Sequence, residues 1–141
     1  MAKEIPEELF VGYVGQKVLL EKNEKLLMCQ GVGKGDPWDF PGGRLHKDEE
    51  LEAGLLREVH EELGIKIKRG ELFGVYAHHN SRGGAPKLLV VYRGDFIDNP
   101  SNIVCAKDEI YAVQWVGKED VEKIETHPIW RDVLRKYFEL T

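Results

Sequence analysis

Four charged residues near the end of one helical pattern are best suited to chemistry: Arg57, Glu58, Glu61 and Glu62. On an ideal helix Glu58 and Glu62 share a face, while Glu61 lies on the other side of Glu58. Like charges this close destabilise a helix, and partial burial adds a desolvation cost. A hard cation such as Mg²⁺ removes both costs, because it takes oxygen ligands and is often shared with substrate phosphates. The cluster therefore indicates either a metal site or a solvated acidic face with ordinary salt bridges.

A glycine-containing loop and one helix must position these acids. The loop is Pro41-Gly42-Gly43, whose glycines permit a positive φ or a close approach of the backbone. The helix is expected to start near Asp48 or Glu49, with Asp48 as a suitable N-cap, and Gly64 suits its C-terminal stop. The two glutamates that share a face lie at the border of the apolar seam and should be partly buried. The seam comprises Leu51, Leu55, Leu56, Val59 and Leu63.

The spacing of the fixed residues is more specific than the acid cluster alone. It runs Gly43, five residues, Glu49, seven residues, Arg57-Glu58-Val59, one residue, Glu61-Glu62, one residue, Gly64-Ile65. This pattern resembles the Nudix box at every fixed position, and a chance match in a chain of this length is roughly one in a hundred thousand. The sequence thus resembles the Nudix hydrolase superfamily (MutT-like), which favours the metal site over the solvated face.

The resemblance implies an enzyme that cleaves the pyrophosphate bond of a nucleoside diphosphate linked to another moiety, X, with Mg²⁺ or Mn²⁺ as cofactor, and releases a nucleoside monophosphate. The implied metal ligands are the carboxylates of Glu58, Glu61 and Glu62 and the carbonyl of Gly42. A bound metal would neutralise the diphosphate and lower the pKa of a water molecule.

The resemblance also assigns catalytic and bracing roles. Arg57 would orient a glutamate, Glu49 would brace the loop against the helix, and Gly43 would make the turn. Members of the family differ in which acid is the general base. Here it is either Glu61 or a later acid, for which Glu109, just before an expected strand, is the best candidate.

The residues expected to contact substrate lie outside the box. Trp38 could stack on a base or pack in the core, His78 ends a strand near the expected pocket mouth, and Arg82 and Lys87 could touch phosphate or be solvated. Ser81 stands where many ADP-ribose hydrolases have a proline, no tyrosine nearby marks a diadenosine-polyphosphate enzyme, and no coenzyme A motif is present. The resemblance therefore leaves nucleoside triphosphates or nucleotide sugars as substrates. The alternative function is an inert Nudix-fold module that senses a nucleotide or sugar, although such relatives commonly lose box glutamates.

The rest of the sequence predicts an α/β protein of one Nudix domain, residues 1–141. The Nudix fold is an α/β/α sandwich with a mixed central sheet and a catalytic loop-helix-loop. Strands are expected at 9–20, 26–30, 65–79, 87–96 and 110–116, and helices at 118–124 and 128–140 after the box helix.

Composition limits the partners. The net charge is −5 and no Lys/Arg run stands out, which excludes a nucleic-acid polymer as the expected partner. No apolar run is long enough to span a bilayer, and the first residues lack the apolar segment of a signal peptide. Two distant cysteines favour a reduced, cytoplasmic protein. A homodimer is suggested only by analogy with the fold.

Overall fold

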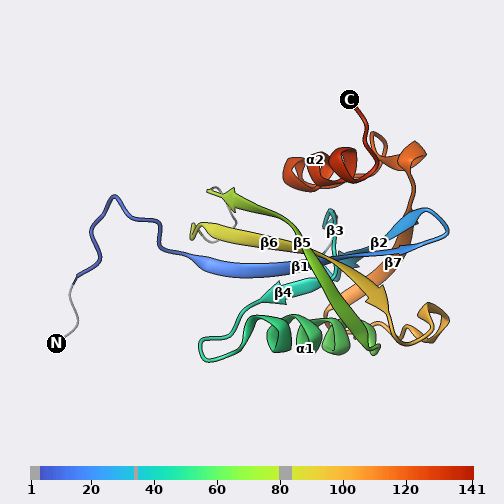
Figure 1. Cartoon of the computed structure of the whole chain (residues 1–141), viewed down its shortest axis with the longest axis horizontal. Coiled ribbons are helices and arrows are strands. Elements are labelled where there is room, and N and C mark those ends of the chain that lie inside the picture. Colours follow the sequence, from blue (N-terminus) through green and yellow to red (C-terminus); the bar gives the residue numbers. More distant parts are fainter. Residues whose placement is uncertain (1–3, 34, 80–83) are drawn as a thin grey trace.

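A computed structural model describes residues 4–33, 35–79 and 84–141 (Figure 1). Its helices are α1 (Leu51–Leu63) and α2 (Pro128–Tyr137), with short 3₁₀ segments η1 (Pro100–Asn102) and η2 (Lys118–Asp120). Its strands are β1 (Tyr13–Lys22), β2 (Lys25–Gly31), β3 (Trp38–Asp39), β4 (Gly42–Arg44), β5 (Ile67–His78), β6 (Lys87–Phe96) and β7 (Ile110–Val116).

The strands form a mixed sheet, as the sequence predicts. β1 runs parallel to β6 and antiparallel to β4, and β5 pairs with the other edge of β6. β2 lies between β3 and β7, antiparallel to both. One half of the sheet thus contains β1, β4, β5 and β6, and the other contains β2, β3 and β7. The β1–β2 hairpin joins them through a turn at Asn23 and Glu24, whose φ values of 52° and 64° suit a tight two-residue connection.

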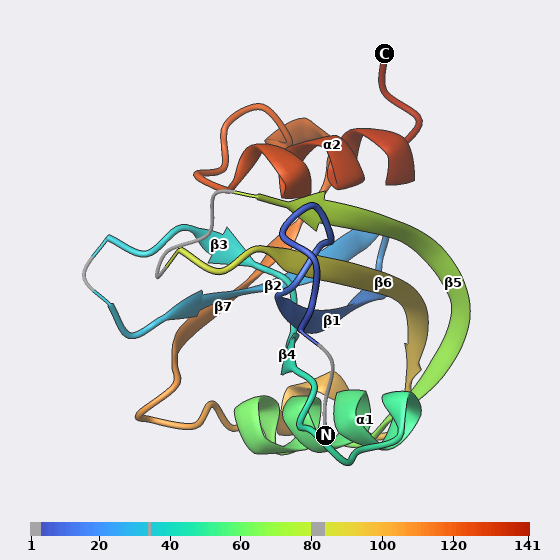
Figure 2. The same cartoon turned by 90° about the vertical axis from the view of Figure 1, so that its left-hand side faces the viewer.

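The two helices cover opposite faces of the sheet, which gives the expected α/β/α arrangement (Figures 1 and 2). On one face Leu55, Val59 and Leu63 of α1 pack in a core with side chains of β1, β2 and β6. On the other face Trp130, Val133 and Leu134 of α2 pack against a separate set of side chains from the same strands. Because alternate residues of a strand point to opposite faces, β1 contributes Val18 and Leu20 to one core and Leu19 to the other.

Several predicted boundaries are wrong. Helix α1 begins at Leu51, and its N-cap is Glu50, which makes no side-chain hydrogen bond, so the predicted N-cap at Asp48 is wrong. Leu51 is 45% exposed, so it does not belong to the buried seam of the helix. In the first turn of α1 the buried Gly54 faces the preceding loop, because a Cβ there would lie 3.0 Å from the side chains of Leu45 and Glu49. Gly64 does end the helix with a φ of 67°.

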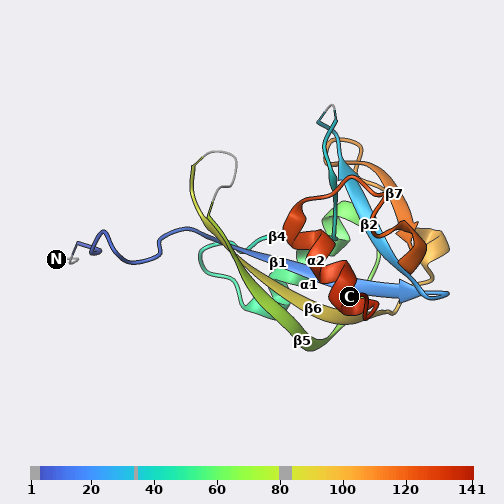
Figure 3. The same cartoon turned by 90° about the horizontal axis from the view of Figure 1, so that it is seen from above.

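The first strand also begins later than expected. Residues 9–12 lie before β1, project from the body of the molecule and expose the apolar side chains Leu9, Phe10 and Val11 (Figure 3). The expected helix at 118–124 is only the single turn η2. In the described part of the chain, no helix is both long and apolar enough to cross a membrane.

Candidate active site

The glycine loop lies directly against the acidic face of α1. The Gly42 N–H donates to Glu62 Oε1 at 2.8 Å, and the φ of Gly42 is 131°, a conformation that favours glycine. A Cβ on Gly43 would lie 2.5 Å from the carboxyl carbon of Glu58. Gly43 therefore lets the loop approach Glu58 more closely than a residue with a side chain would allow, while Gly42 lets the loop lie against the backbone of β1, where its N–H reaches Glu62.

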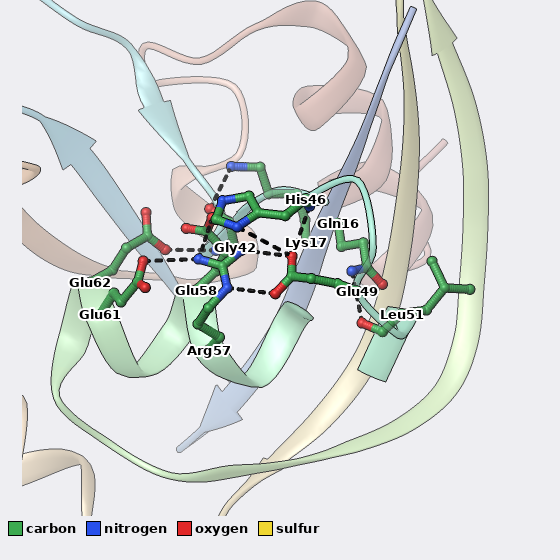
Figure 4. Close-up of polar contacts among 10 residues, drawn as sticks. All are labelled: Gln16, Lys17, Gly42, His46, Glu49, Leu51, Arg57, Glu58, Glu61 and Glu62. Atoms are coloured by element: carbon green, nitrogen blue, oxygen red, sulfur yellow. Dashed lines mark hydrogen bonds and ion pairs between the residues drawn. The ribbon is translucent and has the colours of Figure 1, made fainter. Parts of the chain in front are cut away.

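Arg57 organises the charged residues of the box (Figure 4). Its guanidinium donates to both carboxylate oxygens of Glu49, at 2.6 and 2.9 Å, and Nη1 lies 3.0 Å from Glu61 Oε2 and 3.1 Å from Glu58 Oε1. Glu49 Oε1 also accepts from the N–H of His46 at 2.7 Å. The hydrogen bonds from Arg57 are the main reason why the pKa of Glu49 falls to about 2. Arg57 thus ties the loop before α1 to two glutamates.

The Glu62 carboxylate is the most desolvated acid of this cluster. Burial raises the pKa of Glu62 to about 7, although nearby Lys17 and the Gly42 N–H both favour its charged form. The side chain of Lys17 is only 12% exposed, and its ammonium binds Asp39 Oδ2 at 3.0 Å and the carbonyls of Phe40 and Gly42 at 3.1 and 3.4 Å. A buried cation therefore secures the same loop from the side of β1.

We expect the metal-free protein to lose stability as the pH rises from about 5 to 8. The folded-state pKa of Glu62, about 7, lies above its ordinary value of 4.5, so the folded state binds more protons in this window. The free energy of unfolding should then fall with pH, by at most roughly 3 kcal/mol. Glu62→Gln should flatten this dependence in urea unfolding with a chelator present. An equal slope in the variant would show that Glu62 titrates normally.

Glu109 lies beside the box acids, although it comes from a distant part of the sequence. The loop before β7 is tied to the end of α1 by hydrogen bonds from the N–H groups of Val104 and Ala106 to the carbonyls of Leu63 and Glu62. Desolvation and then the nearby acids, including Asp108 and Glu58, raise the pKa of Glu109. Its side chain is exposed and available to a substrate.

The donor set fits a hard divalent cation in chemistry. All four candidate ligands, Glu58, Glu61, Glu62 and the Gly42 carbonyl, offer oxygen, which Mg²⁺ and Mn²⁺ prefer. Among the described residues, the partly buried Glu62 carboxylate forms no ion pair within 4.0 Å, since those of Arg57 go to the other glutamates, although Lys17 lies near enough to favour its charged form. Within the described ranges, however, no three His, Cys, Asp or Glu side chains already converge as a metal site.

The predicted substrate residues have different surroundings. Trp38 is half-buried in β3, and its backbone pairs with Glu125 and Thr126 ahead of α2. His78 ends β5 and packs against His127 in a tilted arrangement, with ring centroids 4.4 Å apart and the ring planes at 54°. Arg82 falls outside the described residues.

Two residues near this site were not identified from the sequence, Lys17 and His127. The signal for Lys17 is a single lysine inside an apolar strand. For His127 it is a polar residue directly before Pro128, where α2 begins, which is the position of a helix cap.

The fold is that of an α/β protein with a mixed sheet between two helices. Its candidate active site lies where the glycine loop meets the acid-bearing helix α1. The family model of the NUDIX domain matches residues 14–138, so the chain belongs to the Nudix hydrolase family. The expected family, fold and class of enzyme are confirmed.

Individual relatives agree with this assignment. The chain is 34% identical over 107 residues to a MutT-like protein of Streptomyces ambofaciens, covering 75% of this chain and 64% of that protein. It is 36% identical over 118 residues to diphosphoinositol polyphosphate phosphohydrolase 3-alpha of Mus musculus, covering 82% and 70%. The solved structure of a MutT protein from Methanosarcina mazei Go1 aligns with a TM-score of 0.75 at 23% identity, covering 90% of this chain and 93% of that one.

Proposed function

We propose that this chain hydrolyses the pyrophosphate bond of a nucleoside diphosphate linked to X, with Mg²⁺ or Mn²⁺, and releases a nucleoside monophosphate. The observation that carries this proposal is the pair Glu58 and Glu62 on one face of α1 against the loop at Gly42 and Gly43, with Glu61 nearby and bound to Arg57. An inert sensing module would not need three carboxylates held together against their mutual repulsion.

In this mechanism Glu58 and Glu62, with Glu61 and the Gly42 carbonyl, would hold the cation. The cation supplies neutralisation of the diphosphate charge and activation of water. Arg57 keeps Glu58 and Glu61 in place through contacts of 3.1 and 3.0 Å, and Glu49 in turn holds Arg57.

The general base takes a proton from the attacking water, and two acids are candidates for this role. Glu61 is half-exposed, and its carboxylate is already engaged in an ion pair with Arg57 Nη1 at 3.0 Å, so it is less free to accept a hydrogen bond from water. Glu109 is exposed beside the cluster, and its pKa is raised, which strengthens it as a base at neutral pH. We therefore propose that Glu109 is the general base.

For the substrate we propose a nucleoside triphosphate or a nucleotide sugar, with Trp38, His78 and Arg82 as contacts. A diphosphoinositol polyphosphate is the second candidate, favoured by the name of the 36% identical mouse relative.

We further propose that residues 1–141 form one Nudix domain that works in the cytoplasm, either alone or as a homodimer. It would act on small molecules and not on nucleic-acid polymers or membranes.

The decisive experiment is a product-release screen with Mg²⁺, with Mn²⁺ and with a chelator. It should cover nucleoside triphosphates, nucleotide sugars, ADP-ribose, dinucleoside polyphosphates and a diphosphoinositol polyphosphate. We expect metal-dependent release of a nucleoside monophosphate from at least one nucleotide. Release only from the inositol compound would favour the second candidate, and no turnover of any compound would favour a sensing module.

A further inference from the structure

Basic side chains gather where β5 ends and β6 begins. His78 and Lys87 are direct partners in the register of these strands, and Lys87 is also level with Tyr13 of β1. Arg44, at the end of β4, lies over the Tyr13 ring with its guanidinium carbon 4.1 Å from the ring centroid. His127 reaches the same place from the residue before α2, where its ring packs against the ring of His78. Four different elements thus bring basic groups to one location.

These cations have few acids to balance them. Lys87 is half-buried, and desolvation and then the charges of Arg44 and Lys17 lower its pKa, while only Asp39 opposes this effect. Asp39 is itself bound to Lys17 at 3.0 Å. Within the described residues, neither Lys87 nor Arg44 forms an ion pair. In a chain with a net charge of −5, a half-buried lysine without a carboxylate partner indicates that the missing anion comes from a ligand.

The position of the His127 proton adds a donor at the same location. Nδ1 of His127 accepts a hydrogen bond from the N–H of Ile129 at 3.1 Å, so in the neutral ring the proton is on Nε2. Desolvation and the neighbouring His78 both lower the pKa of His127 and favour that neutral form. His127 therefore offers an N–H donor even when it carries no charge.

Hydrogen bonds and then electrostatic interactions link the acids of α1 to this cluster. Glu62 accepts from Gly42, the Gly42 carbonyl accepts from Lys17, and Lys17 binds Asp39. Asp39 in turn interacts electrostatically with both Lys87 and His127. A substrate whose diphosphate lies at the acids of α1 could therefore extend its X moiety toward the basic residues.

We propose that Lys87, His78 and His127, with Arg44 at the rim, bind a phosphate group on the X moiety of the substrate, apart from the diphosphate that is cleaved. This inference rests on the proposed function and narrows it, because it selects substrates whose X moiety carries a further phosphate. Lys87 and Arg44 supply charge-assisted hydrogen bonds, and the two histidines supply ring N–H donors.

The test uses a pair of ligands that share one diphosphate and differ by one phosphate monoester, NADPH and NADH. In both, nicotinamide riboside is taken as the nucleoside and the adenosine half as X, so that the 2′-phosphate of NADPH is the further phosphate on X. Binding to the intact protein is measured by calorimetry in a chelator, so that no turnover is needed. We expect NADPH to bind more tightly than NADH. Lys87→Met should weaken the binding of NADPH by about tenfold and have little effect on the binding of NADH. Inorganic phosphate should shift the imidazole NMR signals of His78 and His127 in the wild type and much less in Lys87→Met.

Two variants serve as controls. Lys87→Arg keeps the charge and should keep the preference for NADPH, which separates loss of charge from damage to β6. Lys68→Met removes an exposed lysine at the other end of β5 and should change the binding of neither NADPH nor NADH.

Equal binding of NADPH and NADH would overturn the proposal, even if free phosphate binds, because the site would then not read the X moiety. Phosphate shifts of the same size in Lys87→Met would also overturn it. Metal-dependent hydrolysis of nucleotides is measured separately, so loss of the phosphate preference would not by itself contradict the proposed hydrolysis.

Discussion

Glu58→Gln and Glu62→Gln are each expected to reduce metal-dependent turnover by about a thousandfold while the protein stays folded. Both side chains are candidate ligands on the same face of α1, four residues apart. Glutamine keeps the size and one oxygen but loses the charge that holds a divalent cation, which costs several kcal/mol of transition-state stabilisation. Turnover should be measured across a range of Mg²⁺ concentrations to separate weaker metal binding from a slower reaction.

Stability should not follow activity in these variants. Glutamine at position 62 still offers an oxygen to the Gly42 N–H and no longer has to be desolvated as an anion, so Glu62→Gln should be at least as stable as the wild type at pH 8 without metal. Binding of Mn²⁺ to the same proteins, followed by calorimetry, gives a readout that does not depend on catalysis.

Glu52→Gln is the matched control, because Glu52 lies in the first turn of α1 and its side chain is 56% exposed. It removes the same charge from the same helix and should leave both turnover and Mn²⁺ binding within about twofold of the wild type. Near-normal activity in both Glu58→Gln and Glu62→Gln would show that the metal is held elsewhere.

Much of the fold could be predicted from local patterns. The strands at 87–96 and 110–116 were predicted with the bounds that the structure has, because each is a dense apolar run between turn signals. The end of α1 at Gly64 was also predicted, since a residue at positive φ there favours glycine. The start of α1 was missed because Glu49, an apparent first-turn acid, is instead bound by Arg57 and the His46 N–H outside the helix.

The candidate site was predictable only where its residues share one helix. Helical spacing placed Glu58 and Glu62 on one partly buried face, and the structure agrees. Lys17 and His127 are brought to the site by strand pairing and by the packing of α2, which depend on contacts between distant parts of the sequence. Local patterns mark both positions as unusual, but they do not specify contacts between distant parts of the sequence, so the fold was needed to place these residues at the site.

Gly42→Ala is expected to destabilise the protein by roughly 3–5 kcal/mol, a large share of the stability of a typical domain. Two costs add together. The φ of Gly42, 131°, is strained for any residue with a side chain, and a Cβ there would lie 2.0 Å from the carbonyl oxygen of Gln16. That oxygen belongs to the backbone of β1, so it cannot move aside without disturbing the pairing of β1 with β4.

The adjacent glycine should respond differently. A Cβ on Gly43 would meet the end of the Glu58 side chain, which can rotate away, so Gly43→Ala should keep most of the stability and instead lower turnover by displacing a candidate metal ligand. The two neighbouring positions would then separate the role of the loop in folding from its role in holding the carboxylate.

Gly35→Ala is the control that separates the two costs at Gly42. Its φ of 74° is also positive, but a Cβ there would have no atom within 4 Å, so only the backbone term remains and the loss should be about 1 kcal/mol. Urea unfolding of the three variants, with the m-value checked for each, measures these differences directly. If Gly42→Ala cost no more than Gly35→Ala, the loop would be free to move away from β1. The close approach of Gly42 to Glu62 would then not be fixed by the sheet.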